Sequence, residues 1–264
     1  MVLPQAGKAT LQDEPAVTLL PEGMVNPPAQ ESVWVTNSPE QLAKNAAVVE
    51  SVSKLIEKTA SIYATAGWVH SSSKSETIIE QTGKLPDGAP IPTSWVTDSW
   101  LLLDENGYLL QGVAIQDTGS PSTFQVSVFK NGVWNNLTLG VSPEAGNTED
   151  ITPYRPMDHT VLEQAARDKD IAVLEARDAL LGNEGVTEFT ITEKQLAPYN
   201  ITGSSYQLIG TAIKYYLSNK TGLVLQTEQY YISADGEYEL IQRHTITITE
   251  KVKDPPAEVM KYLE

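Results

Sequence analysis

Cysteine is absent from this chain of 264 residues, and histidine occurs only three times. Without cysteine the chain forms no disulfide, has no thiolate nucleophile and cannot bind zinc or an iron–sulfur cluster through sulfur. The three histidines do not have the spacing of a metal site. The composition therefore predicts no metal and no cofactor. It does not indicate a compartment, because cysteine-free chains occur on both sides of a membrane.

Basic residues are also scarce, since 18 Lys and Arg stand against 34 Asp and Glu and give a formal net charge of −16. A nucleic-acid backbone would be repelled by such a surface, so we expect no nucleic-acid partner. No apolar run approaches the roughly 18 residues that a membrane-spanning helix needs, so we expect no membrane span. Residues 1–5 lack the basic start and apolar stretch of a signal peptide. Two interpretations remain: a cytosolic protein, or an exported one whose signal or anchor is absent here.

Catalytic motifs are missing as well. The sequence contains no P-loop, no G-x-G-x-x-G, no G-x-S-x-G and no H-E-x-x-H. A glycosidase would need two carboxylates roughly 5–10 Å apart, for which Asp98, Asp104, Glu105 and Glu228 are candidates. Asp104 and Glu105 lie in a turn, where aspartate is favoured for local reasons, and His70 could instead pair with a carboxylate of a neighbouring strand. We therefore expect a protein that is not an enzyme.

Residues 206–253 are the most informative part of the chain. They read as three long strands joined by turns at Asn219–Gly222 and Ala234–Gly236, which supply residues that tolerate a positive φ. The third strand alternates between two faces. One predicted face carries Ile241, Arg243, Thr245, Thr247 and Thr249, and the other His244, Ile246 and Ile248.

Helix signals occur at two other places. Ser38 and Pro39 begin a helix that we expect to end near residue 64, with Gln41 placed to complete a capping box. A second helix is predicted to begin at Asp158 or Thr160 and to continue, through Leu174 and Leu181, to Gly182. Residues 255–262 predict a short terminal helix.

The remaining segments predict strands and one extended arm. Residues 67–140 read as neighbouring antiparallel strands, with the strongest hairpin signal at Lys130-Asn-Gly132. Residues 1–37 are rich in proline and predict an extended arm or linker, and residues 38–264 a single domain. Runs of strands between single helices indicate the α+β class. Because strands of ten or more residues usually curl, we expect a strongly curved antiparallel sheet, a half-barrel, with helices packed on its concave side.

Aromatic residues are the candidate site. Most tryptophans and several tyrosines fall on predicted strands, and each Tyr-Tyr pair puts one ring on each face of the sheet. One interpretation is a packed core with scattered surface rings. The other is a cavity for an apolar ligand, whose predicted binding residues are Trp68, Trp95, Trp100, Trp134, Tyr215 and Tyr231.

Three short passages carry a resemblance to a known family. The first is the capped helix of residues 38–64 running into Gly67-Trp-Val-His70. The second is Tyr215-Tyr-Leu-Ser-Asn-Lys-Thr-Gly-Leu-Val-Leu-Gln-Thr-Glu228, and the third is the closing Pro255-Pro-Ala-Glu-Val259. In these passages and in the order of its elements, the chain resembles the LolA-like superfamily of bacterial extracytoplasmic proteins. That group includes lipoprotein carriers, LppX/LprG-type lipoproteins and RseB-type sensors.

The resemblance implies a function as well as a fold. It implies an extracytoplasmic, periplasmic or cell-surface, non-enzymatic domain that binds a lipid or other apolar ligand in a cavity between the curved sheet and its helices. The alternative is a sensor or protein-interaction module of an envelope signalling system, whose groove binds a protein segment. No residue-level binding motif of the family is present in this sequence, and the lipobox cysteine is absent.

Overall fold

The computed structural model describes residues 34–63, 65–78, 92–119, 124–137, 157–200 and 207–264. Residues 32–264 belong to one compact unit. Most of the predicted arm lies outside the described residues, so the division at residue 37 stays a prediction. The described end of that segment contacts the sheet: Trp34 bridges to Gln195, and the Val35 N–H donates to the Lys194 carbonyl at 2.9 Å.

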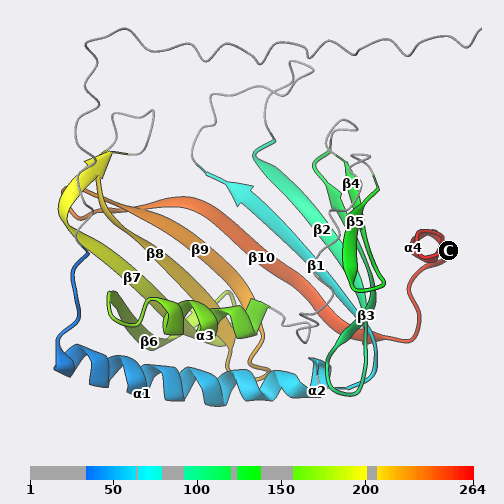
Figure 1. Cartoon of the computed structure of the whole chain (residues 1–264), viewed down its shortest axis with the longest axis horizontal. Coiled ribbons are helices and arrows are strands. Elements are labelled where there is room, and N and C mark those ends of the chain that lie inside the picture. The colour runs from blue at the N-terminus through cyan, green and yellow to red at the C-terminus, as the bar shows by residue number, and fades with distance from the viewer. Residues whose placement is uncertain (1–33, 64, 79–91, 120–123, 138–156, 201–206) are drawn as a thin grey trace, which may run out of the picture. The chain divides into compact units, whose positions relative to one another are not determined.

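Ten antiparallel strands form a single sheet (Figure 1). Their order in space is β5-β4-β3-β2-β1-β10-β9-β8-β7-β6, and β5 and β6 end this order without pairing with each other. The sheet is therefore open, and the predicted α+β class with an antiparallel sheet is confirmed. The strands are β1 Gly67–Thr77, β2 Ser94–Leu103, β3 Leu109–Asp117, β4 Gln125–Lys130, β5 Val133–Asn136, β6 Ala172–Leu181, β7 Glu184–Asn200, β8 Gln207–Ser218, β9 Val224–Ser233 and β10 Tyr238–Val252.

The first and last strands join the two halves of this sheet. β1 and β10 pair antiparallel from Trp68 opposite Val252 to Thr77 opposite Gln242. The strands within residues 67–136 and 207–252 follow the predicted hairpins, including the turn at Asn131 and Gly132, which both have positive φ. The pairing of β1 with β10 was not predicted, because no local signal specifies which distant strands meet.

Short helices complete the fold. They are α1 Pro39–Ile56, the 3₁₀ turn Glu57–Thr59, α2 Ala60–Tyr63, α3 Met157–Arg167 and α4 Ala257–Met260. The predicted start at Ser38 is confirmed, since its hydroxyl accepts the Gln41 N–H at 3.2 Å. The Gln41 side chain donates to Asn45 at 3.0 Å, so one half of the expected capping box, the bond from the Gln41 N–H to Ser38, is present. In the part of the chain that is described, no helix is long and apolar enough to cross a membrane.

The second predicted helix is wrong over most of its length. α3 ends at Arg167, and residues 172–181 form β6, which pairs with β7 over its whole length. The segment is rich in Ala, Leu, Glu and Arg, which favour helices, but pairing with β7 and burial of Ala172 and Leu174 outweigh that weak preference. Gly182, predicted to end the helix, instead follows strand β6 in the turn to β7, with φ +62°.

The alternation predicted for the last strand holds only for part of β10. Ile246 lies opposite Ser73, whereas Ile248 lies opposite Ser72, so Thr247 is an extra residue at a register shift. Ser72 and Ser73 are neighbours on β1, so they point to opposite faces of the sheet, and each shares its face with the residue paired to it on β10. Ile246 and Ile248 therefore do not share a face, as the sequence had suggested.

One row of directly opposed residues crosses seven strands and defines what we call the helix side of the sheet. From β2 to β6 it consists of Trp95, Ser75, His244, Thr227, Tyr215, Phe189 and Ala176. Helices α1 and α3 lie on this side over β6–β9 (Figure 1). They share one core cluster with those strands, to which the helices contribute Val52, Ile56, Val161 and Ala165.

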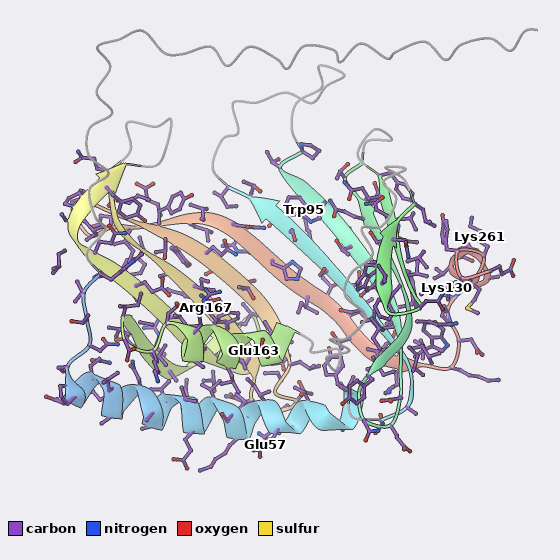
Figure 2. The ribbon with its side chains drawn as sticks, in the orientation of Figure 1. Glu57, Trp95, Lys130, Glu163, Arg167 and Lys261 are labelled. Atoms are coloured by element: carbon purple, nitrogen blue, oxygen red, sulfur yellow. The ribbon has the colours of Figure 1, made fainter. Side chains whose placement is uncertain are left out.

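The opposite side of the sheet is covered by α4 at the other end. Trp68 packs with Val113, Val126 and Val128 against Val259 and Leu263 from the C-terminal segment. Lys130, labelled beside α4 in Figure 2, donates to the Leu263 carbonyl at 3.0 Å and holds this segment on the sheet. The core under α1 and α3 and the core under α4 thus lie at opposite ends of the strand order, and a smaller cluster of Val69, Leu101 and Leu103 packs against α2 on the helix side.

Candidate functional site

The helix side of the sheet divides into two halves of different chemistry. In β6–β8 two neighbouring rows are apolar, and in β9, β10 and β1 the same rows continue as neutral polar side chains. We call the apolar part the seat, defined by Leu174, Phe189, Ile191, Ile213, Tyr215 and Leu217. We call the polar part the stripe, defined by Ser75, Thr77, Thr227, Gln229, Gln242 and His244.

The seat is fully packed by its two helices. Phe189 and Leu217 have no exposed surface, and the Phe189 and Tyr215 rings stack with centroids 6.1 Å apart. Burial raises the pKa of Tyr215 to about 12, with the nearby Arg167 opposing that shift, so its hydroxyl stays protonated. Removing this much apolar surface from water is the main force that keeps α1 and α3 in place.

Helix α1 is fixed to the sheet near both ends. Asn45 donates to the Ala172 carbonyl at 2.7 Å and accepts the Leu174 N–H at 3.0 Å, so it binds the backbone of β6 as a further strand would. Near the other end Lys58 donates to the Asn219 carbonyl at 2.7 Å. Gly222 lies so close to the Leu55 carbonyl that any side chain there would overlap it. α1 is therefore a rigid wall of the seat.

Helix α3 has fewer polar contacts with the sheet in the part of the chain that is described. Val161 and Ala165 are buried against the seat, and Leu162 is partly buried there. The polar contacts gather at its C-terminal end, where Asp168 accepts from Gln164 at 3.2 Å and from Arg167 at 3.1 Å. Figure 2 shows Arg167 on α3, beside the strands of the seat.

An acidic side chain lies at the border of the seat. Glu193 lies on β7, where it pairs with Ala172 of β6. It is on the same side of the sheet as Phe189 and Ile191. Burial raises its pKa to about 7, assisted by the negative charge of Asp168 and a hydrogen bond with that residue, and opposed by Arg167. The sequence contained a signal for this residue, because an acid four positions after Phe189 on a strand must share its face. Our sequence reasoning did not use that signal.

The stripe carries no charge and is only partly buried, since Ser75 and Thr227 are buried and Gln229 is exposed. The Ser75 hydroxyl and His244 Nδ1 form a hydrogen bond of 2.8 Å, and both Ser75 and Thr227 are buried. Burial lowers the pKa of His244, so this ring is neutral at pH 7. A pair of this kind lacks the bond from a carboxylate to the second ring nitrogen that orients histidine in a hydrolytic triad, since no such bond is found among the described residues. We read it as a satisfied polar pair.

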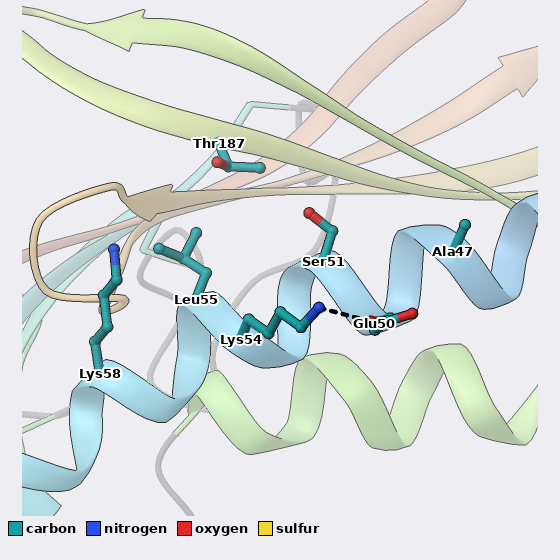
Figure 3. Close-up of a pocket in the computed structure, with 7 residues that line it drawn as sticks. All are labelled: Ala47, Glu50, Ser51, Lys54, Leu55, Lys58 and Thr187. Carbon is teal, nitrogen blue, oxygen red and sulfur yellow. Dashed lines mark hydrogen bonds and ion pairs between the residues drawn. The ribbon is translucent and has the colours of Figure 1, made fainter.

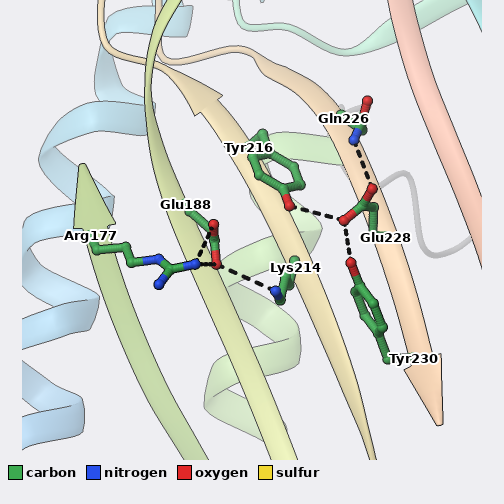
Figure 4. A network of polar contacts seen from close by, with 7 residues as sticks. All are labelled: Arg177, Glu188, Lys214, Tyr216, Gln226, Glu228 and Tyr230. Carbon is green, nitrogen blue, oxygen red and sulfur yellow. Dashed lines mark hydrogen bonds and ion pairs between the residues drawn. The ribbon is translucent and has the colours of Figure 1, made fainter. Parts of the chain in front are cut away.

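On the opposite side of the same strands, two buried carboxylates form a polar network (Figure 4). Glu228 accepts from the Tyr216 hydroxyl at 2.9 Å, the Tyr230 hydroxyl, Gln226 at 3.0 Å and Arg243 at 2.9 Å. Burial alone would raise the pKa of Glu228, but the hydrogen bonds outweigh it and the pKa is lowered. A carboxylate held ionised by four donors is suited to stabilising the sheet and not to donating a proton.

The second carboxylate of this network is also saturated with partners. Both oxygens of Glu188 accept from Arg177 Nη2, at 2.8 and 2.9 Å, and Lys214 lies 3.6 Å away. The Lys214 ammonium also lies 5.0 Å from the centre of the Tyr230 ring. These residues were not singled out from the sequence, because the pairing of β7, β8 and β9 that brings them together is not a local property.

The carboxylates considered for glycosidase chemistry do not converge. Asp98 on β2 and Glu228 on β9 are separated by β1 and β10, so three strand spacings of about 4.8 Å put them at least roughly 14 Å apart. The alternative pairing of His70 is confirmed: His70 Nε2 lies 3.3 Å from Asp98 and its Nδ1 3.6 Å from Glu250. The His70 ring also stacks on Trp100 at 4.7 Å.

The six predicted ligand-binding rings lie in several places. Trp68 and Trp100 belong to the core under α4, on the side opposite the helices. Tyr215 lies in the seat, and strand register places Trp95 and Tyr231 on the helix side beside the stripe. Trp134 lies on β5 with its ring centre 5.5 Å from that of Phe129. By register Trp134 is also on the helix side, at the far β5 end of the sheet, so four of the six rings share one face and only Trp95, Tyr215 and Tyr231 lie near the seat and the stripe.

Two open hollows lie near the seat, and neither is lined by any of these rings. The first, of about 530 Å³, is bordered by α1 and by Thr187 of β7 (Figure 3). It contains the Lys54–Glu50 ion pair of 2.6 Å and the stem of Lys58. The second, of about 580 Å³, lies at the β6–β7 and β8–β9 turns beside Ile246 and Ile248. Within the described residues, no group of three or more His, Asp and Glu could hold a metal ion.

Comparison with known proteins finds likeness in structure but none in sequence. No protein-family model matches the chain, and no curated protein matches it. The structure is similar to the crystal structure of a LolA superfamily protein from Nitrosomonas europaea. The match covers 79% of this chain and 96% of that chain, with 10% sequence identity and a TM-score of 0.29. This is the superfamily that the sequence resembles.

Proposed function

We propose that the protein is a non-enzymatic, extracytoplasmic domain that binds the apolar part of a lipid, or another apolar ligand, between its sheet and its helices. The observation that supports this proposal most directly is the seat: a continuous apolar surface on β6–β8 covered by two helices that are held in different ways. In this proposal the sheet curves strongly around those helices, which lie on its concave side. The extracytoplasmic location rests on the sequence resemblance.

Helix α3 is the part that a ligand would replace. Full burial of one Val or Leu side chain is worth roughly 1.5–3 kcal/mol, so the buried Val161 and the partly buried Leu162 hold α3 on the seat with at most about 3–6 kcal/mol. Each buried methylene contributes about 0.8 kcal/mol, so an acyl segment of about six methylenes would gain a similar amount. An apolar chain could therefore compete with α3 on equal terms. α1 would remain as a wall, because its polar contacts have no counterpart in a hydrocarbon.

Three of the six predicted rings fit this arrangement. Tyr215 would contact the apolar chain in the seat, and Trp95 and Tyr231 would border the more polar end of the ligand beside the stripe. The stripe offers hydroxyl, amide and imidazole groups without a charge, which suits a polar and uncharged part of the same ligand. Trp68 and Trp100 would act in the core under α4, and Trp134 at the β5 edge.

The test is native mass spectrometry on protein purified without detergent, followed by extraction of any bound molecule. We expect either a co-purified lipid or, on addition of a phospholipid of known mass, a one-to-one complex. The comparison sample is protein incubated with the water-soluble headgroup alone, which should not bind with similar affinity. A clean mass of the free protein, without uptake of any offered lipid, would contradict the proposal.

A second function, as a sensor or protein-interaction module, is favoured by a different observation. The seat is filled in this structure, and within the described residues the outer edges of β5 and β6 pair with no neighbouring strand. A partner segment could add to such an edge as an extra strand, with main-chain hydrogen bonds supplying affinity. This becomes the better interpretation if the lipid experiment fails.

A further inference from the structure

Asp168 follows the C-terminal end of α3 and contacts both the helix and the sheet. Its side chain accepts from Gln164 and Arg167, both in the last turn of the helix. Its backbone carbonyl accepts the N–H of Ala172, the first residue of β6, at 2.7 Å. Asp168 therefore joins the helix, through its side chain, to the start of a sheet strand, through its backbone.

A second carboxyl group comes to the same place from β7. Glu193 lies directly opposite Ala172 on the helix side, and its side chain is hydrogen-bonded to that of Asp168. Two carboxylates have only acceptor oxygens, so a hydrogen bond between them requires that one carries a proton. The side-chain contact between the end of α3 and β7 thus exists only while the pair is protonated, whereas the backbone bond to Ala172 does not depend on that proton.

We infer that Asp168 and Glu193 form a proton-operated catch, which holds α3 on the seat while the pair shares a proton and releases it when the proton is lost. This inference rests on the proposed function for its consequence, since releasing α3 would open the seat to the ligand. The catch itself is a property of the free protein.

The surroundings of the pair support a transition near neutral pH. Burial is the largest effect on Glu193 and raises its pKa from 4.5 to about 7, with the Asp168 charge and hydrogen bond in the same direction. The Arg167 charge, 3.1 Å from Asp168, acts against this shift. Tyr199 on β7 and Tyr231 on β9 face the same region. Burial, and to a smaller extent the charges of Tyr231 and Glu193, raises the pKa of Tyr199, so its phenol stays neutral.

The other neighbours leave the charge balance of the pair unchanged. The residues directly opposite Glu193, Ala172 on β6 and Thr211 on β8, carry no charge. Lys169 and Asp170 follow Asp168 in the turn, where both are exposed and carry opposite charges. The proton shared by the pair is therefore what decides whether the two acids attract or repel each other.

The turn after Asp168 is anchored independently of the catch. Asn37 donates to the carbonyls of Lys169 at 3.0 Å and Ala172 at 2.7 Å, and its own N–H donates to Asp170 at 2.8 Å. Asn45 of α1 donates to the Ala172 carbonyl as well. When the pair repels, the start of β6 stays in place and α3 moves about residues 167–168.

The direction of the pH effect follows from linkage. A carboxyl whose pKa is raised in the closed form binds its proton more tightly there, so the closed form is favoured below pH 4.5 and this advantage is lost as the pH rises through about 7. The full shift would make release roughly 25-fold more favourable at pH 8 than at pH 5.5. Because Glu193 is only half-buried, solvent screening reduces the expected change to about tenfold.

The experiment is hydrogen–deuterium exchange of the full chain without ligand at pH 5.5 and pH 8, corrected for the intrinsic exchange rate at each pH. We expect amides of residues 161–167 to lose about tenfold in protection at pH 8, and those of α1 to change little. Glu193→Gln keeps a donor toward Asp168 at both pH values, so it should remove the difference. Asp170→Asn, which removes an exposed charge of the same turn, should leave the difference intact.

The outcomes separate the catch from the proposed function. Equal protection of α3 at both pH values, or an unchanged difference in Glu193→Gln, would overturn the catch whatever the protein binds. A pH-dependent α3 in a protein that takes up no phospholipid at pH 8 would support the catch and overturn the lipid-binding proposal. If both hold, uptake of the same phospholipid should be about tenfold weaker at pH 5.5 than at pH 8 in the wild type and equal in Glu193→Gln.

Discussion

The seat and the stripe are two halves of one face, built on the same sheet with continuous backbone pairing, yet only the seat carries α1 and α3. The row that contains Phe189 and Tyr215 in the seat continues as Thr227, His244 and Ser75 in the stripe. Backbone hydrogen bonds are satisfied equally in both halves, so they do not decide what covers the face. The apolar side chains do, because they alone gain from contact with a helix.

The largest expected difference between the halves is in stability. Phe189→Ala removes a fully buried ring from the seat and should lower the free energy of unfolding by about 3–5 kcal/mol. Trp95→Ala, in the same row at the stripe end, should cost clearly less because the Trp95 ring is partly exposed. Urea denaturation of both variants measures the two losses. Equal losses would mean that the stripe is packed as tightly as the seat.

The anchor of α1 comes next in size. Asn45→Ala removes three hydrogen bonds, one of them from Gln41 within α1, and leaves the Leu174 N–H and the Ala172 carbonyl without this partner, which should cost about 2–3 kcal/mol. Asn45→Asp keeps an acceptor for Leu174 and loses only the donor toward Ala172. Its thermal transition should therefore lie between those of the wild type and Asn45→Ala. The same loss in both variants would show that the Leu174 contact does not hold the helix.

Weakening α3 sharpens the comparison in function as well as stability. Val161→Ala, at the α3–seat contact, and Val113→Ala, in the core under α4, each shorten a fully buried valine and should cost about 1–3 kcal/mol. Only Val161→Ala weakens the competitor of the ligand. If Val161→Ala lowers the free energy needed to release α3 from the seat by about 1.4 kcal/mol, the apparent lipid affinity rises about tenfold. Titration followed by native mass spectrometry measures this affinity. Equal affinities in the two variants would contradict competition by α3.

What could be foreseen from the sequence differs between these same regions. The hairpins of residues 67–136 and 207–252 are specified locally, by turns such as Asn131-Gly132 and by alternating strands. The helix start at Ser38 is local too. These features were predicted because a few adjacent residues determine them.

The site depends on contacts between distant segments and could be predicted only in part. β6 has a helical composition and becomes a strand because β7 pairs with it, and β1 meets β10 through residues about 170 positions apart. Without these pairings, neither the facing of Glu193 and Asp168 nor the Glu188–Glu228 network could be derived. The aromatic residues were found on strands, but the face of each ring depends on register, including the shift at Thr247.

The smallest expected effect belongs to the stripe and concerns pH. Burial lowers the pKa of His244 in the folded protein, so the unfolded chain binds the proton more tightly and stability should fall as the pH drops below about 6.5. His244→Gln removes the titrating group while keeping a polar side chain opposite Ser75, and should flatten that fall by less than about 1 kcal/mol. Urea denaturation at pH 5.5 and 7.5 measures the change. Both the reference protein and the His244→Gln protein carry Glu193→Gln, because Glu193 would otherwise add stability toward low pH and mask the effect of His244. If the double variant still loses stability toward pH 5.5 as the Glu193→Gln protein does, the stripe does not depend on a neutral His244.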